Sequence, residues 1–189
     1  MTARWVVDEV VPNRDVNITW QPISLLEKNQ PPADSDYYAP VARTHGYLRV
    51  MESLRAAEGD AAVFPLYWEF GRRIHHDGQI EFDPADALRA IGADESHAAA
   101  IDDATWDTEI QTRMSRALEL TGDDVGTPII ALDNDEGEKV ALFGPVITKV
   151  PSTEQSVALW DGFVAMAKTP GFWELKRTRT QRPEFGERP

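Results

Sequence analysis

A proline stands at the head of the clearest strand pattern in this sequence. Residues Ile129 to Leu132 form a short apolar run, and the pair Thr127-Pro128 comes immediately before it. Proline has no N–H group to donate to a sheet, so it is confined to the first position of a strand, to an edge strand or to a bulge. The position of Pro128 therefore predicts where this strand begins.

Strand patterns lie at both ends of the chain and enclose a long helical block. VNITWQ, residues 16–21, alternates apolar and polar side chains and predicts a strand. A second apolar run, KVALF, follows Ile129–Leu132 after a turn that contains glycine, so residues 129–143 predict an antiparallel hairpin. Residues 2–11 carry apolar side chains at helical spacing and predict a helix; the density of β-branched residues leaves a short strand as the alternative.

Residues 37–121 predict a succession of helices. The first ends near Gly59, the second runs from Asp60 to about Gly78, and the third has Asp83 as its N-cap, Pro84 in its first turn and Gly92 just past its end. The block then continues from Asp94 to Thr121, with Ile110, Met114, Ala117 and Leu118 on its buried side. After the hairpin, Ser152 and Gln155 form a capping box that predicts one more helix, which Thr169-Pro170-Gly171 ends.

Composition excludes several classes of protein. The chain of 189 residues carries a net charge of −13, which disfavours nucleic acid and anionic membranes as partners. No apolar run approaches the length of a membrane span, and no secretory signal pattern is present, so we expect a cytoplasmic protein without a membrane partner. The chain contains no cysteine, which excludes disulfides, protein thiolates and cysteine-based metal sites within it.

The order helix, strand, helical block, hairpin, helix is similar to an α/β thioredoxin-like fold of DsbA type from which the first strand is missing. We expect residues 1–36 and 122–175 to form its incomplete core, residues 37–121 a helical insertion, and residues 176–189 a polar C-terminal tail. A proline that opens the third strand is a hallmark of that fold, where the X-Pro bond is cis. The likeness implies that main-chain groups of residues 126–127 face a groove that holds the substrate or a thiol cofactor.

Several segments narrow this likeness to one family. The sequence resembles the actinobacterial DsbA-like proteins typified by mycothiol-dependent nitroreductase, in the segments RWVVDEV, SLLEKNQ, RRIHHDGQ, VGTPII, FGPVI and FWELKRTRT. The resemblance implies a thiol–disulfide oxidoreductase or a mycothiol-dependent reductase. Mycothiol or a similar small thiol would be its cofactor, and a disulfide or nitro compound its substrate; a homodimer is left open.

One departure from the family is as informative as the match. The family has a Cys-Pro-aromatic-X redox motif at the N-terminus of its first helix, where the helix end favours a thiolate. Here the sequence starts at Met1, just past the place of that motif. We expect a misassigned start, because losing a central strand would leave unpaired main-chain groups that cost about 1–3 kcal/mol each. The alternative is a chain that truly lacks its catalytic motif; in either case we expect this cysteine-free chain to be redox-inactive.

Two other functions remain open from the sequence. One is a redox-inactive binding module that keeps the groove without the chemistry. The other is a thiol-cofactor-dependent isomerase similar to 2-hydroxychromene-2-carboxylate isomerase, which shares the fold and the insertion. The WELKRTRT tail favours the nitroreductase-like branch over the isomerase.

The predicted site residues are few. We expect Gly126, Thr127 and Pro128 to contact the substrate, against the alternative of a plain strand-initiating turn with a trans bond. His75 is a candidate for lining the groove, although histidines at a helix C-terminus also suit the helix dipole. We expect no catalytic residue within this chain.

Other candidates are weaker. His75 and His76, with His45 and His97, could suggest a metal site, but we expect none, because adjacent histidines point about 100° apart on a helix. The run Lys176–Arg182 predicts a solvated tail, with ligand docking as the alternative. The sequence shows no phosphate-binding glycine loop and no Ser-His-Asp arrangement.

Overall fold

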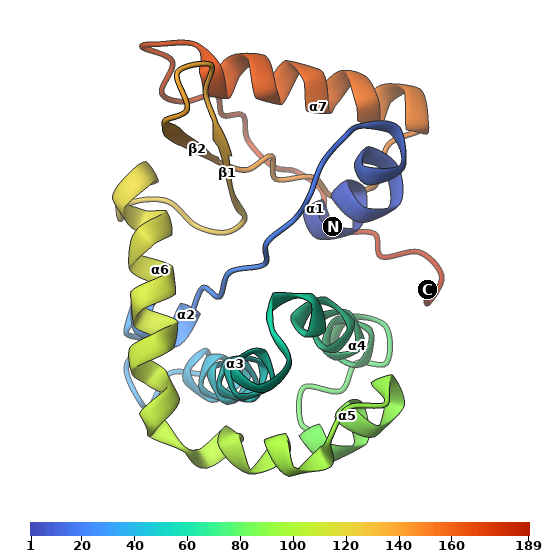
Figure 1. Ribbon diagram of the computed structural model, residues 1–189, viewed down its shortest axis with the longest axis vertical. Helices are drawn as coiled ribbons and strands as arrows, with labels where there is room; N and C mark the ends of the chain where they lie inside the picture. The colour runs from blue at the N-terminus through green and yellow to red at the C-terminus, as the bar shows by residue number, and fades with distance from the viewer. The chain divides into compact units, whose positions relative to one another are not determined.

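The structure, a computed structural model that describes residues 1–189, divides into two compact units (Figure 1). The hairpin unit comprises residues 1–18 and 116–186, and the helical unit comprises residues 19–115 and 187–189. The sequence placed the corresponding divisions at 36/37 and 121/122, whereas the units divide at 18/19 and 115/116. None of the helices combines the length and the apolar character that a membrane crossing requires.

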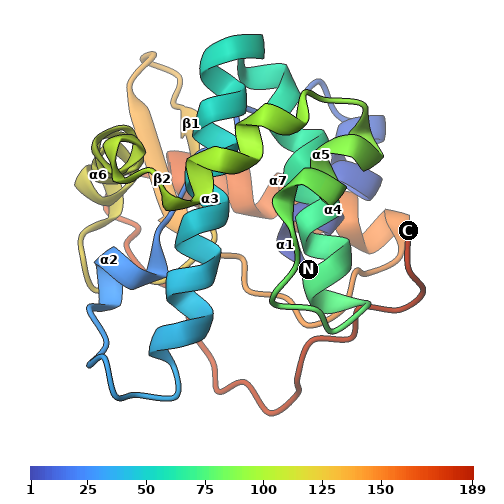
Figure 2. The same cartoon turned by 90° about the horizontal axis from the view of Figure 1, so that it is seen from below.

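The helical unit confirms the helices predicted between residues 37 and 121. Its α-helices, seen from below in Figure 2, are α2 (Leu25–Asn29), α3 (Tyr38–Glu58), α4 (Val63–His75), α5 (Pro84–Ile91) and most of α6 (Asp107–Thr121). Short 3-10 segments cover Asp60–Ala62, Glu95–Asp102 and Ala104–Trp106. The predicted caps are present: Asp83 accepts a hydrogen bond from the N–H of Ala85 at 2.9 Å, and Gly59 and Gly92 end α3 and α5 at positive φ.

The core of the helical unit lies on the inner face of α3. Tyr47, Val50 and Leu54 of this helix are buried against Leu66 and Phe70 of α4. The Tyr47 ring also stacks on Phe82, with ring centroids 4.6 Å apart. The apolar spacing of these helices thus follows their buried faces, which is why the sequence pattern located them.

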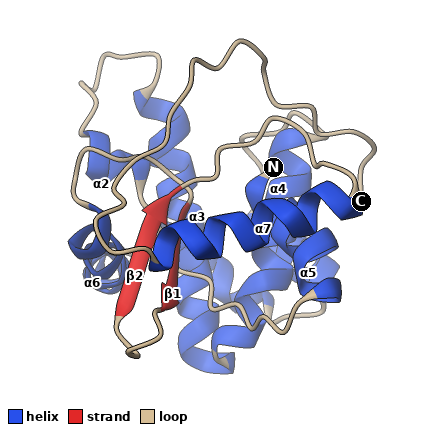
Figure 3. Cartoon of the chain, turned by 90° about the horizontal axis from the view of Figure 1, so that it is seen from above, coloured by secondary structure: helices blue, strands red, loops and turns tan.

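The hairpin unit confirms the hairpin and the helices that flank it. Strand β1 (Ile129–Asp133) pairs antiparallel with β2 (Lys139–Phe143), and Ala131 lies opposite Ala141. Helix α7 (Thr153–Lys168) contacts β2 (Figure 3). Residues 2–11 are helical, as predicted: α1 (Thr2–Trp5) continues into a π-helical turn, Val6–Val10, and a 3-10 turn, Val11–Asn13.

The core of the hairpin unit is small. It consists of the buried side chains of Trp5, Val6 and Val10, with partly buried apolar residues packed around them. The Trp5 and Trp160 rings lie 6.0 Å apart, so the first helical segment packs on α7. The buried apolar cluster of the helical unit is larger.

The strand predicted at residues 16–21 is wrong. Val16, Ile18 and Trp20 are indeed more buried than their neighbours, but this segment has no β-ladder partner, and the sheet contains β1 and β2 alone. Val16 and Ile18 pack on the Trp5 cluster, while Trp20 stacks on Phe64 and Tyr67 in the helical unit. Side-chain packing therefore produces an alternating pattern here without main-chain pairing.

Candidate functional site

The predicted substrate-contact residues form the turn that leads into β1. The Thr127–Pro128 peptide bond is cis, and a second cis bond joins Gly144 to Pro145. The N–H of Gly144 donates to the carbonyl of Pro128 at 2.8 Å, so the turn is joined to the end of the hairpin. Thr127 is exposed, whereas Gly126 and Pro128 are half-buried. The turn is thus a fixed and accessible feature of the hairpin unit.

The main-chain polar groups of this turn are not used in hydrogen bonds within the protein at Gly126 and Thr127. Neither Gly126 nor Thr127 makes a hydrogen bond through its N–H or its C=O group. Beside the turn lies the Phe143 ring, 43% exposed, whose Cε2 atom would be 3.4 Å from a Cβ atom added to Gly126. The turn therefore offers free donors and acceptors next to an exposed aromatic ring.

His75, the other predicted site residue, belongs to the helical unit, whereas this turn belongs to the hairpin unit. It is the last residue of α4 in the helical unit, and it is exposed. Partial desolvation, with repulsion from His76, lowers the pKa of His75 below its ordinary value. His75 and Thr127 belong to different units, and the groove-lining role of His75 stays a prediction.

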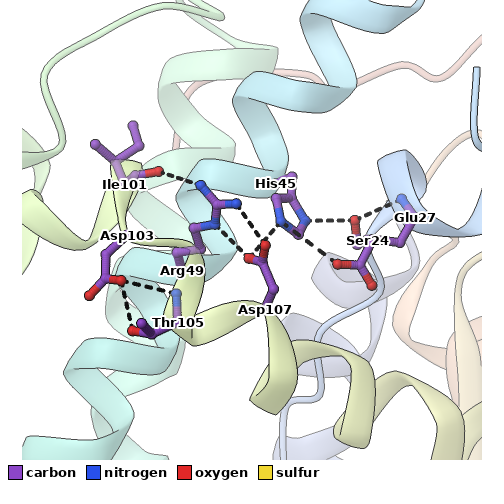
Figure 4. A network of polar contacts seen from close by, with 8 residues as sticks. All are labelled: Ser24, Glu27, His45, Arg49, Ile101, Asp103, Thr105 and Asp107. Atoms are coloured by element: carbon purple, nitrogen blue, oxygen red, sulfur yellow. Dashed lines mark hydrogen bonds and ion pairs between the residues drawn. The ribbon is translucent and has the colours of Figure 1, made fainter. Parts of the chain in front are cut away.

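A polar network that sequence reasoning missed lies in the helical unit (Figure 4). Ser24 caps the short helix α2, and its hydroxyl oxygen accepts a hydrogen bond from the N–H of Glu27 at 3.2 Å. The sequence contained a signal for this cap, because Ser24-Leu25-Leu26-Glu27 has the spacing of a capping box. The network then continues onto α3 through His45 and Arg49, one helical turn apart, and onto the first residue of α6, Asp107.

His45 is the centre of the network and is only 4% exposed. Its Nδ1 atom lies 2.8 Å from the Ser24 hydroxyl, and its Nε2 atom lies 2.9 Å from Oδ1 of Asp107. An ionised carboxylate can only accept a hydrogen bond, so Nε2 carries a proton. In a neutral imidazole Nδ1 is then the acceptor, and the Ser24 hydroxyl donates to it.

Arg49 holds the other side of Asp107. Its Nε atom donates to Oδ1 at 2.6 Å and its Nη2 atom donates to Oδ2 at 2.8 Å, a bidentate pair. These hydrogen bonds from Arg49, together with the one from His45, keep the pKa of Asp107 below its ordinary value despite partial burial. Asp107 is therefore ionised at neutral pH, and its charge also suits the N-terminus of α6.

The structure thus contains a Ser-His-Asp chain, contrary to the expectation from the sequence. Ser24 is 1% exposed, and its oxygen already accepts the N–H of Glu27, so no substrate can reach it as a nucleophile. The chain of hydrogen bonds instead ties α2, α3 and α6 together. These residues are dispersed in the sequence, and only the packing of the three helices brings them together.

The same residues also present a set of potential metal ligands. Glu27, His45 and Asp107 each offer one ligand atom, and these atoms lie within 4.8 Å of one another. The prediction of no metal considered the four histidines and no carboxylate partner. The structure combines one histidine with two carboxylates from other helices.

The basic run predicted near the C-terminus is exposed, as expected for a solvated tail. Lys176, Arg177, Arg179 and Arg182 all lie in a segment without helix or strand. Trp173 and Leu175, just before them, are 85% and 78% exposed. The ligand-docking alternative for this segment stays a prediction.

A protein-family model matches almost the whole chain. The model of the Rv2466c-like family, described as mycothiol-dependent nitroreductase Rv2466c, matches residues 1–177. The matched range includes the turn at residues 126–128 and all members of the Ser24–Asp107 network.

Proposed function

Because the chain belongs to the Rv2466c-like family of mycothiol-dependent nitroreductases, we propose that it takes part in the mycothiol-dependent reduction of a disulfide or nitro compound. We further propose that its hairpin and flanking helices form the core of a thioredoxin-like fold of DsbA type. Reduction by a small thiol is cytoplasmic chemistry, since thiols are kept reduced in that compartment.

The open main chain of Gly126 and Thr127 is the observation that carries the proposed site. An extended ligand gains affinity when it forms main-chain hydrogen bonds with groups that no strand satisfies. The free groups at residues 126–127 are of this kind, and the exposed ring of Phe143 adds apolar contact area beside them. The proposed ligand is mycothiol or its adduct with the substrate.

Because the chain contains no cysteine, it can bind a thiol cofactor but cannot itself supply a thiolate nucleophile. Thiol–disulfide exchange needs a thiolate as the attacking group, and this sequence has none to offer. We therefore propose that the chain binds the thiol cofactor and that the cofactor supplies the only sulfur nucleophile. On this account the 189-residue chain has no disulfide exchange activity of its own.

A binding experiment tests the site. We expect isothermal titration with mycothiol to show saturable binding to the wild-type chain. The Gly126→Leu variant should weaken it at least tenfold, because the added side chain fills the space beside Phe143. Gly162→Leu is the matched control, since Gly162 is an exposed glycine of α7 with no atom near its added Cβ. Equal affinity of the two variants would contradict the proposed location.

A turnover experiment tests the proposed redox inactivity of the chain and the isomerase alternative. Without added mycothiol, we expect the purified chain to leave a mycothiol disulfide and a nitroaromatic compound unchanged, although it binds mycothiol in the separate titration. Binding without turnover is also what the binding-module alternative predicts, and the absence of cysteine is the observation that favours it. Reduction of either compound by the chain alone would overturn the proposed redox inactivity. Conversion of a 2-hydroxychromene-2-carboxylate would instead favour the isomerase.

A further inference from the structure

The Glu27–His45–Asp107 cluster has the dimensions of a metal site. The His45 Nε2 atom lies 2.9 Å from Oδ1 of Asp107 and 3.9 Å from Oε1 of Glu27. Bonds of about 2.0–2.1 Å to a tetrahedral ion require ligand atoms about 3.3–3.4 Å apart. The two distances from His45 bracket this value, and all three ligand atoms lie within 4.8 Å of one another, so side-chain adjustments without a change of fold would bring them to one ion.

Ser24 prepares His45 to act as a ligand. A histidine that binds a metal through one ring nitrogen usually has the other nitrogen held by a hydrogen bond. Here Nδ1 of His45 lies 2.8 Å from the Ser24 hydroxyl, which can either donate to it or accept from it. A proton moved from Nε2 to Nδ1 would therefore free Nε2 for a metal ion while the hydrogen bond to Ser24 persists.

Glu27 is the member of the cluster whose role is otherwise unexplained. Its carboxylate makes no hydrogen bond, and the nearest basic side chain is that of His45, whose Nε2 atom lies 3.9 Å from Oε1 of Glu27. The Glu27 side chain is 18% exposed, so a partly buried carboxylate lies close to the histidine without a full partner. A cation placed between Glu27, His45 and Asp107 would neutralise it.

Charge around the cluster is compatible with a cation in spite of Arg49. Arg49 neutralises Asp107, but Asp102 and Asp103 also act on Arg49 and help to raise its pKa. With Glu27 included, carboxylates outnumber the single guanidinium. Arg49 can also keep its bond from Nη2 to Oδ2 of Asp107 at 2.8 Å while Oδ1 turns to the ion.

We propose that Glu27, His45 and Asp107 bind a divalent transition-metal ion, with Zn²⁺ as the best fit, and that water fills the fourth position. One imidazole and two carboxylates are ligands that Zn²⁺ accepts, whereas Mg²⁺ and Ca²⁺ prefer oxygen ligands alone. Glu27 and Asp107 are 18% and 25% exposed, which gives the ion and the water access. The site does not involve the turn at residues 126–128 and is independent of the proposed function.

Titration with ZnCl₂ tests the proposal directly. We expect one Zn²⁺ per chain by isothermal titration, and a thermal midpoint that rises with Zn²⁺, because a ligand that binds only the folded chain stabilises it. Glu27→Gln should weaken binding at least tenfold, since it removes a charged ligand from a partly exposed position. Glu154→Gln is the matched control, because Glu154 lies in the first turn of another serine-capped helix, α7, and should leave binding unchanged.

Two further measurements test whether the ion binds at Glu27, His45 and Asp107 and not elsewhere on the chain. Co²⁺ in place of Zn²⁺ should give the visible absorption of a four-coordinate site, and Glu27→Gln should remove it. His76→Gln should retain binding, which separates this site from the histidines at the end of α4. The proposal is overturned if the wild-type chain binds no Zn²⁺, or if Glu27→Gln, folded by circular dichroism, binds it as tightly as Glu154→Gln does.

Discussion

The two polar regions of this protein handle their hydrogen-bonding groups in opposite ways. Around His45, side chains from α2, α3 and α6 are buried or half-buried, and all but Glu27 have hydrogen-bond partners. At half-buried Gly126 and exposed Thr127, the main-chain groups have no hydrogen-bond partner within the chain. Buried polar groups must be satisfied within the fold, whereas exposed groups are satisfied by water until a ligand replaces it. We therefore expect the first region to matter for stability and the second for binding.

The largest expected effect is that of Asp107→Ala. This change leaves the Arg49 guanidinium and buried His45 without their shared partner, and breaking such a pair costs about 3 kcal/mol. Urea unfolding in the presence of a chelator should give this loss, and hydrogen exchange should place it in α2, α3 and α6. Asp86→Ala is the control: its pair with Arg89 is exposed, so the loss should be below about 1 kcal/mol. Equal losses in the two variants would remove the distinction between the regions.

Lowering the pH should destabilise the protein by protonating Asp107. The folded-state pKa of Asp107 lies below its ordinary value of 3.8, so its contribution to stability is fully present above that value. It is lost as the pH falls through the lower, folded-state pKa. We expect the free energy of unfolding of the wild-type chain to decrease below about pH 4, and that of Asp107→Asn to decrease less steeply. Parallel curves for the two proteins would show that Asp107 does not contribute to the acid response.

A smaller loss should follow Gly46→Ala, beside the network on α3. An added Cβ would lie 2.7 Å from Cγ1 of Ile101 and 3.2 Å from its carbonyl oxygen. Overpacking of this kind costs about 1–3 kcal/mol, which the better helix propensity of alanine offsets by about 1 kcal/mol. We expect a net loss in urea unfolding; a gain would mean that Ile101 moves aside freely.

The same substitution should have the opposite sign in the hairpin unit. Gly162 lies in α7 with no atom within 4 Å of an added Cβ, so alanine gains helix propensity without a clash. Gly162→Ala should therefore raise the free energy of unfolding by about 0.5–1 kcal/mol. A thermal or urea midpoint that does not rise would indicate that α7 contributes little to the stability measured.

The smallest effect on stability should be that of Thr127→Ala. The Thr127 side chain is exposed and makes no hydrogen bond, so the change should stay within about 0.5 kcal/mol. If the turn binds mycothiol, substitutions at residues 126–127 should change the affinity for mycothiol, although the Thr127 substitution barely changes the free energy of unfolding. A large loss of stability would show instead that the turn is part of the folding core.

Whether the sequence predicted a helix or strand correctly depends on how far apart in the chain the interacting residues lie. The caps at Asp83, Gly59 and Gly92 act within a few residues, and they located the helix ends correctly. The hairpin was predictable because its strands adjoin one short turn. Residues 16–21 alternate as a strand does, yet a strand also needs a partner, and an alternating pattern does not provide one.

Through local propensity, capping and periodicity, the sequence specifies the helices between residues 37 and 121, the hairpin and the position of the turn at Thr127-Pro128, although α2 was not predicted. It also determined that no cysteine chemistry originates in this chain. The proximity of Ser24, Glu27, His45 and Asp107 depends instead on tertiary packing. His45 and Asp107 are separated by 62 positions in the chain, and no local pattern relates a histidine on one helix to an aspartate that begins another. Their contact depends on how α3 and α6 pack, which is a property of the folded helical unit.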